Sequence, residues 1–315
     1  MQTTIAAIAT AQAPGGIGVI RISGPQAAEI AARVFHSRRG DIRDIPGYTA
    51  LFGWVEDQNG DKADEAIALR FRAPHSFTGE DVVELSCHGG LVILQQVLAA
   101  VLAAGAAPAG PGEFTRRAYC NGKMDLAEAE AVMQMISARG TQAARAALSG
   151  HDGALSRKIG ALRQELLLIA SHLAAWADYP DDDVPQITEG FLEKHLATVE
   201  NDLRRLLSTF DAGRVLREGV DTVIVGRPNA GKSTLMNRLT GTERSIVTEV
   251  AGTTRDVVEE TVQLGQVLLR LSDTAGIRET DDPVEKIGVQ RAREKFASAE
   301  LIFLVFDASQ ELNDE

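Results

Sequence analysis

The sequence predicts a multidomain α/β protein, and three observations support this class. Strand and helix signals are mixed over residues 1–121, strand signals vanish from 125 to 216, and strands alternate with helices from 218 to 315. We therefore expect an N-terminal α+β domain at 1–121, a central helical bundle at 122–217 and a C-terminal P-loop domain at 218–315. A chain of 315 residues is long enough for two or three domains that each bury a core.

The first zone carries five predicted strands and two predicted helices. Runs of β-branched and apolar residues predict strands at 5–10, 18–24, 49–56, 65–72 and 81–87. Predicted helices cover residues 25–35 and 91–104, and Pro25 suits the first turn of a helix. Asn59-Gly60 separates two of the strands and is typical of a hairpin turn.

The second zone predicts three long helices packed as a bundle. Asp125 and Glu128 form a capping-box pattern, in which each side chain accepts a hydrogen bond from the backbone of the other residue. Apolar residues then recur at helical spacing over residues 155–173 and 192–207. Segment 179–185 holds two prolines and three aspartates and is expected to break the bundle as a solvated loop. A metal site at the aspartates is the less favoured alternative.

The third zone begins with a phosphate-binding pattern. Residues 222–234 read TVIVGRPNAGKST, in which a β-branched run enters a Gly-x-x-x-x-Gly-Lys-Ser loop and a helix follows. Gly226 and Gly231 let successive backbone N–H groups point at phosphate oxygens, and the helix N-terminus adds a favourable dipole. Lys232 can reach the β- and γ-phosphates, and the Ser233 hydroxyl can bind Mg²⁺. The pattern therefore predicts a nucleoside triphosphate site rather than a chance glycine turn.

Two downstream motifs narrow the class of nucleotide-binding protein. DTAG at 273–276 follows a predicted strand at 267–273, which puts Asp273 where a carboxylate holds the magnesium shell through water. GTTRD at 252–256 holds Thr254, which would reach the metal only when the γ-phosphate is present, as in a switch segment. A polar loop with a threonine cap is the alternative for GTTRD alone. The other predicted elements of this zone are a helix at 285–299 and a strand at 301–307.

Composition and charge limit the possible partners. The net charge of −12 argues against broad non-specific binding of nucleic acid, although a local basic patch could still dock RNA. Cys87 and Cys120 form no CxxC pair, which suits a reducing cytosol. No basic segment precedes an apolar run at Met1, and no apolar stretch approaches the length of a membrane span. The sequence therefore predicts a cytoplasmic protein with no signal peptide and no membrane partner.

Several stretches resemble one family of GTPases. GRPNAGKS, GTTRD and DTAG are similar to the motifs of the TrmE–Era–Era-like–septin group of P-loop GTPases. PGGIGVIRISGP, SFTGEDVVELSCHGG, GPGEFTRRAYCNGKMDLAEAEAV and FDAGRVLREG resemble the MnmE (TrmE) family of tRNA modification GTPases within that group. The resemblance extends over nearly the whole chain. It implies a tetrahydrofolate-binding domain at the N-terminus and a GTPase domain at the C-terminus.

The resemblance implies which residues bind GTP and its metal ions. The GTP-binding positions would be Asn229, Ala230, Gly231, Lys232, Ser233, Thr234, Thr248, Glu249, Val250, Ala251, Gly252, Thr253, Thr254, Asp273, Thr274, Ala275 and Gly276. Mg²⁺ would be bound by Ser233 and Thr254. K⁺ would be bound by the Asn229 side chain and by backbone oxygens around Thr248, Val250 and Thr253. K⁺ is a hard cation that prefers oxygen ligands, so this set is chemically reasonable.

The resemblance also implies that Glu285 is catalytic. Ile277 stands just after the DxxG motif, where many GTPases place a glutamine that orients the attacking water, and isoleucine cannot polarise water. In the family a potassium ion supplies charge between two G domains that close on each other, and the water-positioning carboxylate maps onto Glu285. Without the family, Glu285 would be read as an exposed acid at a helix start.

A folate site is implied for the N-terminal zone. Its ligand would be 5-formyl- or methylene-tetrahydrofolate, and its contacts carry over to Arg21, Glu84 and Lys123. The two cations can meet the glutamate tail of the ligand, and the carboxylate can accept hydrogen bonds from the N–H groups of the pterin. From the sequence alone each of the three would be an ordinary surface charge.

The resemblance further implies the partners. The protein would act on tRNA with MnmG (GidA), a flavin- and NADH-dependent protein, and the pair would add a carboxymethylaminomethyl-type group to C5 of the wobble uridine. The N-terminal domain would form a homodimer, which joins MnmG in a heterotetramer and brings two GTPase domains to high effective concentration. GTP hydrolysis would drive a conformational gate rather than the alkylation itself.

The sequence departs from the family pattern near its end. No Asn-Lys-x-Asp motif, which reads guanine, occurs before Glu315, and the terminal Cys-x-Gly-Lys of the family is absent. We therefore expect a chain that is truncated within the GTPase domain, whose preference for guanine rests on the resemblance.

Two other functions compete with a tRNA-modifying GTPase. One is a nucleotide-dependent switch or assembly factor that does not hydrolyse, which Ile277 and the expected truncation favour. The other is a folate-dependent one-carbon transferase in which the P-loop domain is only regulatory.

Overall fold

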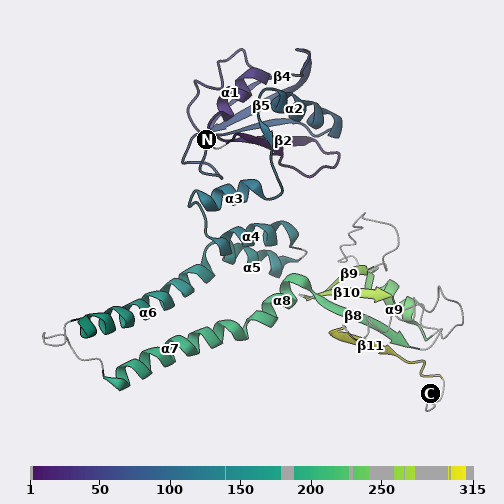
Figure 1. The fold of residues 1–315 in the computed structure, drawn as a ribbon. Helices are drawn as coiled ribbons and strands as arrows, with labels where there is room; N and C mark the ends of the chain where they lie inside the picture. The colour runs from purple at the N-terminus through teal and green to yellow at the C-terminus, as the bar shows by residue number, and fades with distance from the viewer. Residues whose placement is uncertain are drawn as a thin grey trace, which may run out of the picture. The chain divides into compact units, whose positions relative to one another are not determined.

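The structure of the chain is a computed structural model, and it falls into two compact units. The described residues are 3–138, 140–178, 188–226, 230–240, 259–265, 267–273, 297 and 299–309. The two units are Met1–Ala129 and Glu130–Glu315. The finer division at 121/122 and 217/218 stays a prediction. The predicted fold class is confirmed, since an α+β region, a helical region and a nucleotide-binding-type sheet follow one another (Figure 1).

The first unit is built on a seven-stranded sheet. Its strands lie in the order β3-β4-β5-β6-β2-β1-β7, and every neighbouring pair is antiparallel except β1 and β7. The strands are β1 (Ile5–Ile8), β2 (Ile17–Ser23), β3 (Phe35–His36), β4 (Thr49–Glu56), β5 (Lys62–Phe71), β6 (Val82–His88) and β7 (Ala107–Pro108). The helices are α1 (Ala27–Val34), α2 (Leu91–Ala103) and α3 (Glu113–Cys120). The five predicted strands and the two predicted helices are confirmed, whereas α3 was not predicted.

The two faces of this sheet differ because side chains alternate along a strand. Ile20, Ile22 and Leu85 are fully buried and form one core with apolar residues of α1 and α2. Arg21 lies between Ile20 and Ile22, and Glu84 lies between the buried Val83 and Leu85, so both occupy the opposite face of β2 and β6. The sheet therefore carries its core on one face and the charged side chains of Arg21 and Glu84 on the other.

The helical region has five helices among the described residues rather than the three predicted. They are α4 (Leu126–Ser137), α5 (Thr141–His151), α6 (Ala154–Asp178), α7 (Glu189–Ser208) and α8 (Phe210–Glu218). Gly153 takes a positive φ of 75° between α5 and α6, a conformation that glycine adopts at little cost and that ends a helix. The helical pattern over 155–173 begins after this break, so it gave no sign of a separate helix at Thr141–His151. The predicted break at 179–185 lies outside the described residues.

The capping box at the start of α4 is confirmed. The Glu128 N–H donates to Asp125 Oδ1 at 2.9 Å, and the Asp125 N–H donates to Glu128 Oε2 at 2.8 Å. Replacing Asp125 with alanine should lower the free energy of unfolding by about 1 kcal/mol, because one N–H group of the first turn loses its acceptor. Urea denaturation measures the change, and Asp202→Ala on the exposed side of α7 is the matched control. Equal stability of the two variants would contradict the prediction.

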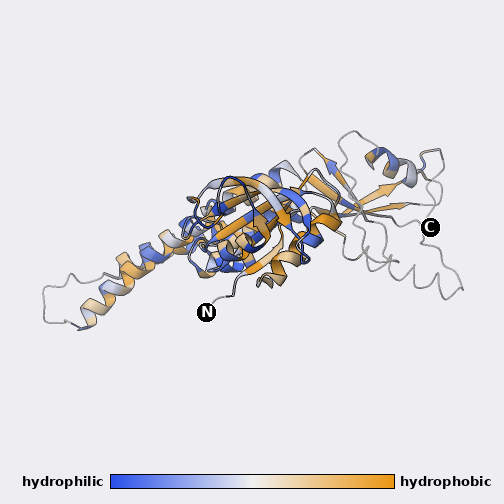
Figure 2. Cartoon of the chain, turned by 90° about the horizontal axis from the view of Figure 1, so that it is seen from above, coloured by the Kyte–Doolittle hydropathy of each residue, from blue (hydrophilic) through white to orange (hydrophobic). Residues whose placement is uncertain are grey.

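The last sheet has four strands among the described residues, in the order β11-β8-β10-β9. They are β8 (Val220–Gly226), β9 (Glu259–Leu264), β10 (Val267–Asp273) and β11 (Leu301–Val305), and helix α9 (Lys232–Thr240) follows β8. β8 is parallel to both β10 and β11, whereas β9 is antiparallel to β10 and was not predicted. Strand β11 reads LIFLV and the centre of β8 is apolar, whereas β9 reads EETVQL and is mostly polar. Figure 2 colours the residues of this sheet by hydropathy. Most of the predicted helix at 285–299 lies outside the described residues.

The two cysteines have different environments. Cys87 in β6 is buried, whereas Cys120 at the end of α3 is exposed. Burial raises the pKa of the Cys87 thiol to about 12, and the nearby Asp64 charge adds to the shift. Because the thiolate is the reactive form, a thiol reagent at about pH 8 should modify Cys120 in the native protein and Cys87 only after denaturation. Peptide mass mapping checks this, and rapid native modification of Cys87 would contradict it.

Within the part of the chain that the structure describes, no helix has the length and apolarity needed to cross a membrane.

Candidate functional site

The first candidate site lies at the carboxyl edge of the last sheet. Because β8, β10 and β11 are parallel, their carboxyl ends meet at one edge, where open α/β sheets bind ligands. Asp273 pairs with Ile224, and Val305 pairs with Gly226. The backbone of Asp273 therefore ends its strand beside the start of the phosphate-binding loop, as the two motifs predicted.

The two glycines of the loop are required for different reasons. A Cβ atom on Gly226 would lie 2.3 Å from the carbonyl oxygen of Val305, so the close approach of β11 excludes a side chain there. Gly231 has open space around it, but its φ of 99° lies in the left-handed region that favours glycine. The loop thus leaves β8 along a path that depends on glycine at both ends.

Lys232 opens helix α9, and its side chain reaches back to the end of β8. Its Nζ atom donates a hydrogen bond to the Gly226 carbonyl oxygen at 2.7 Å, and the side chain is half-buried. Ser233 and Thr234 follow in the first turn and are exposed. The first N–H groups of a helix point out of its end and attract anions. An ammonium group, a hydroxyl group and a helix N-terminus therefore come together where a polyphosphate would be bound.

Many of the predicted nucleotide-site residues lie outside the described residues. These are Asn229, Thr248, Glu249, Val250, Ala251, Gly252, Thr253, Thr254, Thr274, Ala275, Gly276 and Glu285. Of the proposed GTP contacts, the structure brings together Ala230, Gly231, Lys232, Ser233 and Thr234, with the backbone of Asp273 on the neighbouring strand. The magnesium and potassium ligand sets and the catalytic role of Glu285 stay predictions.

The second candidate site lies on the open face of the first sheet. Arg21 of β2 is the cross-strand partner of Glu84 of β6, and its Nε and Nη2 atoms lie 2.8 and 2.7 Å from Glu84 Oε1. The rings of Phe77 and Phe114 flank the Arg21 guanidinium, with centroids 5.4 and 5.6 Å from its Cζ atom. The structure thus makes one unit of two residues that the sequence analysis assigned to opposite ends of a ligand.

Lys123 reaches the same region through the segment that carries Phe77. Its Nζ atom donates to the Pro74 carbonyl oxygen at 3.1 Å, and its aliphatic stem lies against Gly79, which has a positive φ of 77°. Lys123 therefore lies beside the 74–79 segment, whose Phe77 contacts Arg21. The ammonium group is exposed and available to an anionic part of a ligand.

Sequence reasoning missed four side chains at this second site. Phe77 and Phe114 were not recognised as neighbours of Arg21, nor Glu80 and Arg117 as a buried ion pair with distances of 3.1 and 3.2 Å. All four lie in stretches that carried the family resemblance, but nothing local in those stretches indicates contact between them. Arg117 also contacts Glu113. The pKa of Glu113 lies below its usual range because the Gly110 N–H and the Arg117 guanidinium stabilise its carboxylate.

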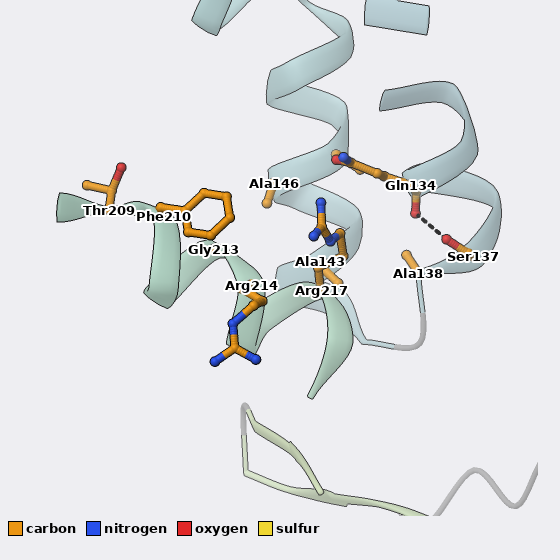
Figure 3. A pocket seen from close by; sticks show the side chains of 11 residues that line it. Gln134, Ser137, Ala138, Ala143, Ala146, Thr209, Phe210, Gly213, Arg214 and Arg217 are labelled. Atoms are coloured by element: carbon orange, nitrogen blue, oxygen red, sulfur yellow. Dashed lines mark hydrogen bonds between the residues drawn. The ribbon is translucent and has the colours of Figure 1, made fainter. Parts of the chain in front are cut away.

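A pocket of about 230 Å³ lies among helices α4, α5 and α8 of the second unit (Figure 3). Its two arginines, Arg214 and Arg217, point in opposite directions in Figure 3. Arg214 pairs with Glu300, and Arg217 pairs with Glu218 at 2.5 Å. Because both positive charges are balanced, the pocket gives no indication of an anionic ligand. Within the described ranges, no group of three His, Cys, Asp or Glu side chains could hold a metal ion.

Comparisons of the chain with family models and with known proteins agree on one family. Residues 4–123 match the family described as GTP-binding protein TrmE N-terminus, and residues 126–312 match the MnmE helical domain. The tRNA modification GTPases MnmE of Symbiobacterium thermophilum and Enterococcus faecalis are each 48% identical to this chain, over 100% and 99% of it. That of Acetivibrio thermocellus is 42% identical over 100% of the chain. The matched part is 69%, 68% and 68% of the length of these three relatives.

Proposed function

Since this chain belongs to the MnmE family of tRNA modification GTPases, we propose that it binds and hydrolyses GTP during the modification of tRNA. The observation that carries this proposal is the loop between β8 and α9. There Gly226 and Gly231 take positions that favour glycine, and the Lys232 ammonium group lies against the end of β8 beside the end of β10. The proposed substrate is GTP with Mg²⁺.

In the proposed reaction Lys232 exchanges one oxygen partner for another. Its ammonium group, which donates to the Gly226 carbonyl oxygen, would turn to the β- and γ-phosphates and keep a charge-assisted hydrogen bond. The first-turn N–H groups of α9 would hold the remaining phosphate oxygens. Ser233 and Thr254 would hold Mg²⁺, which neutralises phosphate charge when bound, and Asp273 would hold its shell through water. A carboxylate, a hydroxyl and nearby phosphates are the hard oxygen ligands that this ion prefers.

The cleavage step is proposed to need Glu285 and K⁺. Ile277 cannot orient water, so Glu285 would position the nucleophile, and K⁺ bound at Asn229 and the 248–253 backbone would supply positive charge between two facing G domains. Family membership supports this part, because these residues lie outside the described ranges.

A binding and turnover assay tests the nucleotide proposal. Labelled GTP should bind the chain in the presence of Mg²⁺ and compete better than ATP, and hydrolysis should rise when KCl replaces NaCl. Single-turnover hydrolysis should slow in Glu285→Ala. Absence of GTP binding would overturn the proposal. Binding with a hydrolysis rate that neither K⁺ nor Glu285→Ala alters would favour the non-hydrolysing switch.

We further propose that the Arg21–Glu84 unit binds the pterin of 5-formyl- or methylene-tetrahydrofolate. A pterin edge presents a carbonyl oxygen beside two N–H donors, which complements an arginine donor beside a carboxylate acceptor. Arg21 and Glu84 offer this pair on one face of β2 and β6, and the exposed Lys123 ammonium suits the glutamate tail. The match to the TrmE N-terminus supports a folate ligand.

Replacing Glu84 with glutamine should weaken binding of 5-formyl-tetrahydrofolate by roughly 10- to 100-fold, because a charged acceptor of the pterin N–H groups is lost. Calorimetry on the whole chain measures the change. Glu65→Gln is the matched control, since Glu65 lies on β5 of the same sheet and pairs with Lys62 in an exposed position. Unchanged affinity in Glu84→Gln would refute the site assignment.

The proposed partners are tRNA, a second copy of the chain joined through the N-terminal domain, and the flavoprotein MnmG (GidA), with which the dimer would form a heterotetramer. The proposed product is a carboxymethylaminomethyl-type group at C5 of the wobble uridine, and the proposed compartment is the cytoplasm. Light scattering of the chain alone and with MnmG tests the assembly. A folate-dependent transferase with a regulatory P-loop would instead transfer the one-carbon unit without GTP.

A further inference from the structure

The first unit contains a buried ion pair on the same side of the sheet as the Arg21–Glu84 site, since Ser23 of β2 joins the two. Arg117 Nη1 lies 3.1 and 3.2 Å from the two carboxylate oxygens of Glu80, and the side chains are 9% and 7% exposed. The Ser23 hydroxyl donates a third hydrogen bond to Glu80 at 2.7 Å. Removing two charges from water costs free energy that their attraction regains only with good geometry. A buried pair of this kind therefore suggests that Glu80 and Arg117 fix the relative positions of the two segments that carry them.

The Glu80 side of the pair fixes the 76–80 turn. The Ser76 hydroxyl donates to the Glu80 carbonyl oxygen at 2.6 Å, and the fully buried Thr78 hydroxyl lies 2.7 Å from that of Ser23. The Asn121 amide donates to the Thr78 carbonyl oxygen at 2.7 Å. This turn carries Phe77, whose ring faces the Arg21 guanidinium.

The Arg117 side of the pair fixes helix α3. Arg117 Nη2 lies 3.0 Å from Glu113 Oε1, and Glu113 Oε2 accepts the Gly110 N–H at 2.8 Å, which ties the start of the helix to the preceding loop. The same helix carries Phe114, whose ring also lies against Arg21. The two rings that flank Arg21 thus come from the two elements that Arg117 joins.

We propose that Arg117, acting through Glu80, is a positioning residue of the second candidate site, because it sets Phe77 and Phe114 against the Arg21 guanidinium. This inference rests on the proposed folate site. The rings of Phe77 and Phe114, with centroids 5.4 and 5.6 Å from Arg21 Cζ, attract the guanidinium. Together they hold it in the orientation that hydrogen-bonds to Glu84. Binding of a planar pterin edge by Arg21 and Glu84 then depends on a pair of charges that need not touch the ligand.

The double variant Glu80→Gln/Arg117→Met tests the inference in the full chain, because it removes both buried charges together. We expect a folded protein with unchanged GTP affinity, whose affinity for 5-formyl-tetrahydrofolate falls roughly tenfold as the rings loosen. Phe114→Leu, which leaves the buried pair intact, should cause a similar loss. Wild-type folate affinity in both variants would overturn the inference.

A second readout separates this inference from the folate proposal. The Arg21 Nε–H donates to Glu84 at 2.8 Å, so its NMR signal, assigned with Arg21→Lys, should exchange slowly with water. Exchange should accelerate in both variants whether or not the wild-type chain binds folate. If the wild type binds no folate, the folate proposal fails, and an unchanged Arg21 signal would still overturn the positioning role. If the double variant does not fold, Phe114→Leu and Asn121→Ala carry the same two measurements.

Discussion

Replacing Lys232 with methionine is expected to weaken GTP binding by about 100-fold, which corresponds to about 3 kcal/mol. The ammonium group is half-buried and already donates to a loop oxygen at 2.7 Å, so it is held close to the phosphate position before the ligand arrives. Methionine keeps much of the aliphatic length but removes the charge. Titration with a fluorescent GTP analogue in Mg²⁺ measures the loss.

The matched control for this prediction is Lys158→Met, which removes an exposed lysine of α6. Its GTP affinity should equal that of the wild type. Lys232→Arg is an informative intermediate, because arginine keeps the charge but presents a planar fork in place of a compact ammonium group. A Lys232→Met variant with wild-type affinity would mean that backbone N–H groups alone hold the phosphates, and the role given to the side chain would be wrong.

The strand and helix that flank the glycine-rich segment could be predicted from the sequence because their determinants are local. A β-branched strand, two glycines and a helix start lie within thirteen residues, and the structure has β8 and α9 in that order. The capping box of α4 is local in the same sense, since its two side chains are three residues apart. The structure added what the pattern could not contain, namely that Gly226 is required by the carbonyl oxygen of Val305 on another strand.

The surroundings of Arg21 could not be predicted because they depend on contacts between distant segments. Arg21 and Glu84 are 63 residues apart in sequence, and Glu80 and Arg117 are 37 apart. Periodicity and turn chemistry describe residues that are neighbours along the chain. They give no information about pairs of residues that are far apart in sequence. Burying a charged side chain also costs free energy, because the charge loses its hydration. From residue type alone, Glu80 and Arg117 would therefore be expected at the surface. Only the fold shows that each supplies the partner that the other needs.

Replacing Arg117 with alanine is expected to lower the free energy of unfolding of the first unit by about 3–5 kcal/mol. The change leaves the Glu80 carboxylate buried without its cation and removes two hydrogen bonds that Arg117 Nη1 makes to that carboxylate. It also frees Glu113, so that helix α3 keeps only its Asn121 hydrogen bond to the Thr78 carbonyl oxygen as a described hydrogen bond to the 76–80 turn. Denaturation followed by Trp54 fluorescence in a Trp176→Phe background reports on the unit that contains the pair.

The neighbouring Arg116 provides the control, since its side chain is 74% exposed and lies 3.9 Å from Glu113. Arg116→Ala should change stability by less than about 0.5 kcal/mol, because exposed ion pairs contribute little. Glu80→Gln/Arg117→Met should be more stable than Arg117→Ala, although it lacks more of the original contacts, because no unpaired charge stays buried. If Arg117→Ala were more stable than the double variant, the Glu80 carboxylate would be stabilised by water or by another partner. The ion pair would then not be what holds α3 to the 76–80 turn.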